Sequence, residues 1–211
     1  PRLIRETRPD GPWAIGGWSY GGLVGQETAR LLADHGTVSA VVLIDSVLPL
    51  PHAGLDPGQE ARRRFAGFAS YVEQAYGSPL VLPYDELSRL DDFAQIELFI
   101  SILQRTVQLP DAALAHQRDS YLDLRSGERH TPAPYLGRTV LYRATEPAPH
   151  TVRDARYERD DDALGWDVLC PDLSVRRVPG DHLSLLSPPA VDELARLLAA
   201  DLSGVPTALQ L

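Results

Sequence analysis

The fold of this chain is decided by the stretch Gly16-Gly17-Trp18-Ser19-Tyr20-Gly21-Gly22. It matches the pattern Gly-x-Ser-x-Gly, with Ser19 at its centre. The apolar residues 13–15 before it have strand character, and apolar residues recur at helical spacing after it. A strand, a sharp turn and a helix in this order are the setting of a nucleophilic serine, because the turn lifts the hydroxyl clear of the sheet. The stretch therefore predicts a catalytic serine.

The other residues of this stretch have expected roles of their own. Gly17 and Gly21 flank Ser19, and we expect a Cβ at either position to crowd the strand against the helix. The amide of Tyr20, at the helix N-terminus, is expected to stabilise an oxyanion. An inert serine in a Gly-rich turn is the simpler alternative. The strand, the helix and the two partner residues described below count against it.

The composition is that of an ordinary globular protein. The chain has 211 residues, 44% hydrophobic and 23% charged, which suits one domain with a sizeable core. A net charge of −9 argues against a nucleic-acid partner, and no apolar run approaches the ~20 residues of a membrane span. The single cysteine, Cys170, provides neither an internal disulfide nor a metal cluster. With no recognisable signal peptide, we expect a cytoplasmic protein without metal.

Four strands are expected, and three of them are followed by residues suited to catalysis. The strands cover residues 13–18, 38–45, 138–144 and 173–178. The second is nearly continuous in apolar, β-branched residues, which is typical of a buried parallel strand. Asp45 ends that strand, Glu146 follows the third and His182 follows the fourth. Functional groups of parallel sheets gather beyond the carboxyl ends of the strands, so each of these residues is a candidate.

Helices are expected between the second and third strands. One apolar stripe lies between Pro57 and Gly77, another precedes Pro110, and a weaker helical segment covers about 111–124. Residues 146–172 show no regular pattern. A last helix follows Pro188-Pro189.

We interpret residues 48–134 as a helical lid inserted into a single domain that spans 1–204, with a flexible tail at 205–211. The run Arg62-Arg63-Arg64 could bind an acidic partner, but a solvated helix face is the favoured expectation. Lids shape substrate channels and exclude water. Core packing is the favoured interpretation for most of the aromatic residues in these helices. The candidates for lining such a channel are Phe65, Phe68, Tyr71, Phe99 and Leu103.

Ser19, Asp45 and His182 follow one another in the order nucleophile, acid, base, which is the order of the α/β-hydrolases. A serine hydroxyl is a poor nucleophile at neutral pH and needs a base within hydrogen-bond reach, a role that imidazole suits. The base in turn needs a carboxylate that fixes its tautomer. Of the six histidines, His182 follows a late strand in a loop with glycine. By position alone, Asp45 and Glu146 both remain candidates for the acid.

The chain resembles the thioesterase domains that terminate type I polyketide synthases and nonribosomal peptide synthetases. The resemblance rests on residues 11–22, 43–46 and 180–186, and it covers most of the chain, the helical lid included. It implies an α/β-hydrolase fold, with a mostly parallel sheet, flanking helices and an inserted helical lid. That family carries its acid one strand after the nucleophile, which favours Asp45 over Glu146.

The resemblance also implies a reaction. A polyketide or peptide chain arrives as a thioester on the phosphopantetheine arm of an acyl or peptidyl carrier protein, and no other cofactor is implied. Ser19 attacks with His182 as base, and water or a nucleophile within the chain then releases an acid or a macrocycle. Two alternatives stay open: a stand-alone esterase or editing thioesterase of the same fold, and a non-catalytic module that docks carrier proteins.

One departure from the family concerns the beginning of the chain. The family has several strands and a helix before the part that matches residues 1–12, and this sequence lacks them. The second oxyanion donor comes from a loop in that part. We therefore expect this chain to be the C-terminal part of a longer domain, with the strand 13–18 exposed at the edge of its sheet.

Overall fold

The computed structural model describes residues 1–9, 11–51, 54–148 and 154–203, so the predicted tail 205–211 lies outside the described residues. The chain divides into two compact units. The first, here called the sheet unit, comprises Pro1–Leu48, Pro132–Ala148 and Arg159–Leu211. The second, the helical unit, comprises Pro49–Thr131 and Pro149–Glu158. The helical unit therefore takes in a short segment beyond the predicted 48–134 insertion.

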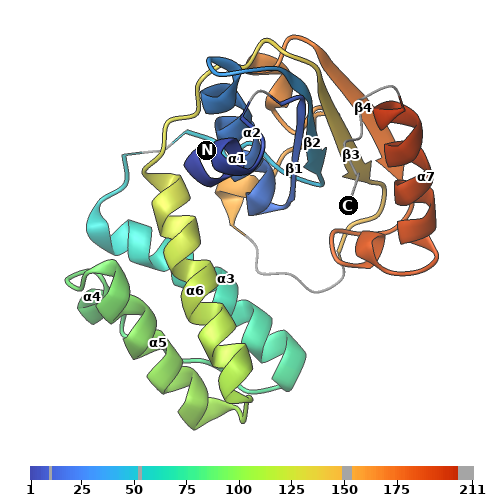
Figure 1. Ribbon diagram of the computed structural model, residues 1–211. Helices are drawn as coiled ribbons and strands as arrows, with labels where there is room; N and C mark the ends of the chain where they lie inside the picture. Colours follow the sequence, from blue (N-terminus) through green and yellow to red (C-terminus); the bar gives the residue numbers. More distant parts are fainter. Residues whose placement is uncertain (10, 52–53, 149–153, 204–211) are drawn as a thin grey trace. The chain divides into compact units, whose positions relative to one another are not determined.

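The sheet unit is built on four parallel strands in the order β1-β2-β3-β4 (Figure 1). Their bounds are β1 Trp13–Trp18, β2 Val38–Ile44, β3 Thr139–Ala144 and β4 Leu173–Val178, within a residue of the prediction. Because all four strands run the same way, their carboxyl ends lie along one edge of the sheet. In this sheet β1 is an edge strand, as predicted.

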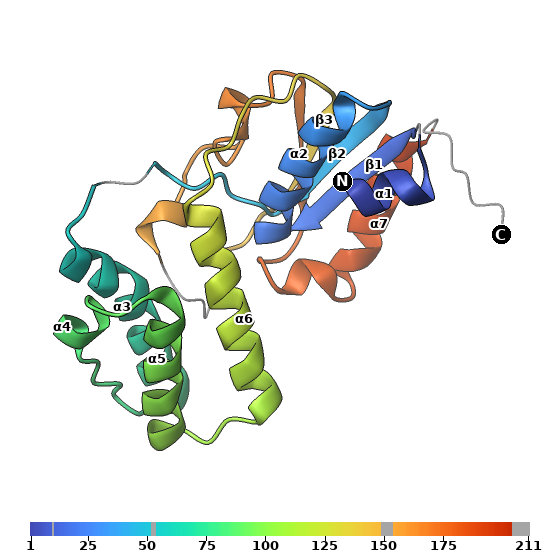
Figure 2. The ribbon, with the colours of Figure 1, turned by 60° about the vertical axis from the view of Figure 1, so that its left-hand side comes forward.

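Alternate residues of the strands point into two separate cores, because side chains of a strand alternate between faces. Val41 and Leu43 pack with Leu23 of helix α2 (Tyr20–Ala33). Val42, between them, packs with Leu194 of α7 (Ala190–Leu202) on the opposite face (Figure 2). The remaining helices of the sheet unit are α1 (Arg2–Thr7), η2 (Trp166–Val168) and η3 (Ser184–Leu186). With both faces covered, the near-continuous apolar run of β2 is explained.

The helical unit holds α3 (Pro57–Tyr76), α4 (Tyr84–Leu87), α5 (Asp92–Thr106), α6 (Asp111–Glu128) and η1 (Ala155–Tyr157). The sequence predicts the three long helices but not α4, which has a single turn. Asp56 caps α3 in a capping box with Gln59, and Gly77 ends that helix at a φ of 66°. Phe65 packs against the rings of Phe99 and Tyr121 in the core of this unit. None of the helices in the described part of the chain is long and apolar enough to cross a membrane.

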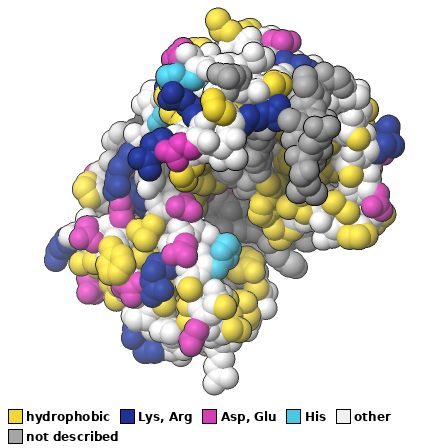
Figure 3. Space-filling model, in the orientation of Figure 1, with side chains coloured by type: hydrophobic (Ala, Val, Ile, Leu, Met, Phe, Trp, Pro, Cys, Tyr) yellow, Lys and Arg dark blue, Asp and Glu magenta, His cyan; other side chains and the backbone are white. Residues whose placement is uncertain are grey.

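The prediction of a solvated helix face for the run Arg62-Arg63-Arg64 is wrong for Arg63 and Arg64. The side chains of Arg63 and Arg64 are only 12% exposed. Arg63 forms ion pairs with Glu60 (3.0 Å), with Glu128 at the end of α6 (2.6 Å) and with Asp154. Charged side chains of both signs lie close together over this unit (Figure 3). Glu128 and Asp154 are distant from Arg63 in sequence, so helical periodicity cannot reveal that they bind this face.

Replacing Arg63 tests how much this ionic cluster stabilises the helical unit. Arg63→Met removes a cation shared by three carboxylates, although Glu60 and Glu128 keep other arginine partners. We expect a loss of about 2–3 kcal/mol in the free energy of unfolding of the helical unit. Arg62→Met is the matched control, because Arg62 is exposed and lies over the ring of Tyr84, 4.7 Å from its centroid. It should cost about 1 kcal/mol or less. Urea unfolding followed by circular dichroism measures both, and equal losses would contradict the cluster's role.

Candidate active site

Ser19 stands at the turn between β1 and α2 with a φ of 54° and a ψ of −126°. A positive φ is uncommon for a residue with a side chain and indicates a strained backbone held by its surroundings. The Ser19 amide donates to the carbonyl of Ile44 at 2.9 Å, and the Gly22 amide donates to the Ser19 carbonyl at 3.1 Å. The strained turn is thus fixed between the end of β2 and the first turn of α2.

The glycines around Ser19 allow the strand and the helix to approach each other closely, although the crowded positions are not the two that the sequence predicts. A Cβ on Gly17 would overlap the carbonyl group of Gly21, as expected. A Cβ on Gly21 itself would meet no heavy atom within 4 Å, so that prediction is wrong. The crowded position is Gly22, whose Cβ would overlap the side chain of Ser46. Each residue turns a helix by about 100°, and here it is Gly22 that faces the end of β2.

Paired alanine substitutions test this assignment. Gly17→Ala forces the strand away from the helix and should cost about 1–3 kcal/mol of stability, as overpacking typically does. Gly21→Ala adds a methyl group in open space within a helix, and should stabilise by about 0.5–1 kcal/mol. The midpoints of urea unfolding compare the two variants with the parent chain. A loss in Gly21→Ala as large as that in Gly17→Ala would mean that the helix is packed differently.

The structure brings together the three residues that the sequence singles out. Nε2 of His182 lies 3.0 Å from Oγ of Ser19, and Nδ1 of His182 lies 2.8 Å from Oδ2 of Asp45. The His182 side chain is 29% exposed and that of Asp45 is 14% exposed, so the carboxylate is the better shielded partner. The three residues lie beyond the carboxyl ends of β1, β2 and β4, where parallel strands gather functional groups.

Two hydrogen bonds aim the Asp45 carboxylate. The Asp45 amide donates to the carbonyl of Tyr142 at 2.7 Å, and the amide of Ala144 donates to Asp45 Oδ1 at 2.8 Å. One carboxylate oxygen is therefore held by the end of β3 while the other faces the imidazole. The rival acid, Glu146, binds elsewhere: its carboxylate accepts from the Gly180 amide at 3.3 Å. Glu146 braces the loop that carries His182 and does not bind the imidazole in this structure.

The loop that carries His182 has its own cap, which the sequence analysis missed. Asp181 Oδ1 accepts from the amides of Leu183 (2.8 Å) and Ser184 (3.1 Å), while the Asp181 amide donates to Ser184 Oγ at 2.8 Å. These backbone hydrogen bonds lower the pKa of Asp181. The spacing Asp-x-x-Ser is typical of a turn held by an Asp side chain, and it was the signal available in the sequence.

Tyr20 is the first residue of α2, directly after Ser19. Amides in the first turn of a helix carry the partial positive charge of its N-terminus. This position is compatible with an oxyanion donor, and that role remains a prediction.

The residues predicted to line a substrate channel all belong to the helical unit. Phe68, Tyr71, Phe99 and Leu103 line one small cavity, of 110 Å³. Phe65 is fully buried in the core and does not line it. A channel function for the other four stays a prediction.

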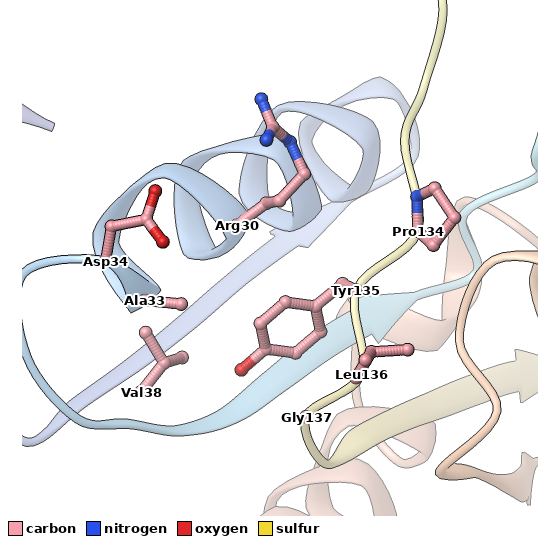
Figure 4. A pocket seen from close by; sticks show the side chains of 8 residues that line it. All are labelled: Arg30, Ala33, Asp34, Val38, Pro134, Tyr135, Leu136 and Gly137. Carbon is pink, nitrogen blue, oxygen red and sulfur yellow. The ribbon is translucent and has the colours of Figure 1, made fainter.

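A larger cavity, of 320 Å³, lies in the sheet unit, and none of Ser19, Asp45 and His182 lines it. Figure 4 shows the side chains around it. It is lined by Arg30, Ala33, Asp34, Val38, Pro134, Tyr135, Leu136 and Gly137. Val38 is the first residue of β2, whereas Asp45 follows the last residue of the same strand. The cavity therefore opens near the amino end of β2, and cannot hold a group that reacts with Ser19.

The parallel sheet, the strained serine turn and the Ser19–His182–Asp45 contacts define an α/β-hydrolase. Solved structures agree on the fold. The NocB thioesterase domain, in covalent complex with a fluorophosphonate nocardicin G analogue, has a TM-score of 0.53 and 24% identity, over 95% of this chain and 70% of that one. A four-domain nonribosomal peptide synthetase bound to AMP and glycine has a TM-score of 0.61 and 22% identity, over 95% of this chain and 15% of that one.

The chain belongs to the thioesterase domain family, whose model matches residues 2–202. Among curated proteins it is similar to the non-reducing polyketide synthase atnG of Arthrinium sp, with 29% identity over 206 residues. That match covers 93% of this chain and 9% of the synthase. The chain thus spans about a tenth or less of the length of the first polyketide synthases that it matches.

Proposed function

We propose that this chain releases an acyl chain, a polyketide or a peptide, from the phosphopantetheine thioester of a carrier protein. The observation that carries the proposal is the contact of Ser19 Oγ with His182 Nε2, with Asp45 at the other imidazole nitrogen. Membership of the thioesterase family supports the reaction type. Relatives among polyketide synthases, and the chondramide synthase of Chondromyces crocatus, support the substrate class.

In the first step Ser19 becomes acylated. Its Oγ forms a bond to the thioester carbonyl carbon while His182 Nε2 takes the hydroxyl proton. The Tyr20 amide donates a hydrogen bond to the oxyanion of the tetrahedral intermediate. The carbon–sulfur bond then breaks, and the leaving thiolate takes the proton from the imidazolium. Asp45 holds Nδ1–H and stabilises the imidazolium while it exists.

In the second step the acyl group leaves Ser19. Water, or a hydroxyl or amine of the acyl chain itself, attacks the ester carbonyl and gives its proton to His182. The bond from carbonyl carbon to Oγ breaks, and Ser19 recovers its proton. The product is an acid in the first case and a macrocycle in the second. No metal or further cofactor enters this scheme, because the carrier's arm presents the substrate.

A fluorophosphonate tests the nucleophile, because it reacts with an activated serine. Intact mass and peptide mapping should place one label on Ser19. The labelling rate should fall by about 10³-fold or more in His182→Ala and in Asp45→Asn, as losses in such triads do. Glu146→Gln is the matched control for the acid, and its rate should stay within about threefold, because Glu146 binds the loop and not the imidazole. A folded chain whose Ser19 stays unlabelled would contradict the proposal and favour a carrier-docking module.

The carrier partner is tested with one acyl group in two forms. The acyl chain is offered either on a phosphopantetheinylated carrier protein or as its N-acetylcysteamine thioester, which copies only the end of the arm. We expect kcat/KM to be about 10-fold or more higher for the carrier-bound form, since protein contacts hold the substrate near Ser19. Equal values would favour a stand-alone esterase or editing thioesterase. Product masses distinguish an acid from a macrocycle.

A further inference from the structure

Trp18 contacts His182 in two ways. The indole and imidazole rings are stacked, with centroids 4.9 Å apart and an interplanar angle of 24°. The indole Nε1–H also donates to the main-chain carbonyl of His182 at 3.1 Å. One side chain thus holds both the ring and the backbone of a residue that lies 164 positions away in the sequence.

Core packing does not explain this tryptophan. Trp18 is the last residue of β1 and is 37% exposed, unlike Trp13 at the other end of the strand, which is 5% exposed. It belongs to none of the three apolar clusters formed by the described residues. Its contacts with His182 supply another reason for its presence.

The imidazole also forms a hydrogen bond at each of its two ring nitrogens. Asp45 is bound at Nδ1 and Ser19 at Nε2. Hydrogen bonds at two nitrogens fix the direction of the ring but do not resist tilting about the line that joins them. A flat aromatic surface against the imidazole face resists that tilt. An indole face also attracts the cation that forms when the base takes a proton.

We propose that Trp18 is a positioning residue for His182, which keeps the imidazole in line between Asp45 and Ser19. The effect on catalysis rests on the proposed function. The effect on the orientation of the imidazole does not rest on the proposed function, because it concerns the free protein. The two can therefore be measured separately.

The first measurement is a proton NMR spectrum of the free chain. The proton between His182 Nδ1 and Asp45 gives a low-field signal when the imidazole is held against the carboxylate, and His182→Gln assigns it. We expect Trp18→Met to broaden this signal or abolish it, and Trp18→Phe, which keeps a ring face but loses the N–H, to retain it in weakened form. Trp13→Phe makes the same substitution at the other end of β1 and should leave it unchanged. Circular dichroism establishes that each variant is folded.

The second measurement is the rate of Ser19 labelling by the fluorophosphonate in the same variants. Trp18→Met should slow it about tenfold, Trp18→Phe less, and Trp13→Phe not at all. A sharp Nδ1–H signal and an unchanged rate in folded Trp18→Met would overturn the positioning role. If the parent chain shows the signal but is never labelled, the proposed function fails. The signal in Trp18→Met still decides the positioning role in that case.

Discussion

The positive φ at Ser19 is the constraint on which the site depends. It brings the end of β1 and the start of α2 so close that Gly17 and Gly22 have no room for a side chain. Gly22 packs against Ser46, the residue directly after Asp45, and the Ser46 carbonyl accepts the indole N–H of Trp166 at 2.7 Å. The contact that makes the serine turn possible therefore also fixes the backbone next to Asp45. Ser19 and Asp45 are positioned by one packing arrangement.

The sequence contains enough to predict the sheet and to single out Ser19, Asp45 and His182, which the structure brings together. Apolar, β-branched runs predict buried parallel strands, and parallel strands have their functional groups at one edge. Ser19, Asp45 and His182 can be singled out because each follows a predicted strand. The choice between Asp45 and Glu146 needs either the family resemblance or the hydrogen bond to Ala144, which no local pattern encodes.

What the sequence could not predict depends on pairs of residues that are distant along the chain. The ion pairs of Arg63 with Glu128 and Asp154, and the stacking of Trp18 on His182, are of this kind. Periodicity describes one helix or strand at a time, so an arginine run on α3 is typical of a solvated face until its acidic partners are known. The error at Gly21 is of another kind, because it depended on which face of a helix turns toward the sheet.

The connection between β2 and β3 has a consequence for how the chain folds. These neighbouring strands pair in register from Val41 with Thr139 onward, although roughly ninety residues separate their facing ends. If the helical unit forms first, the ion pair of Arg63 with Glu128 reduces the open loop to about thirty residues and lowers the entropy cost of closing it by about 1 kcal/mol. In that case the ion pairs of the helical unit form before the sheet does. The rate at which the sheet assembles then depends on charges that lie outside the sheet.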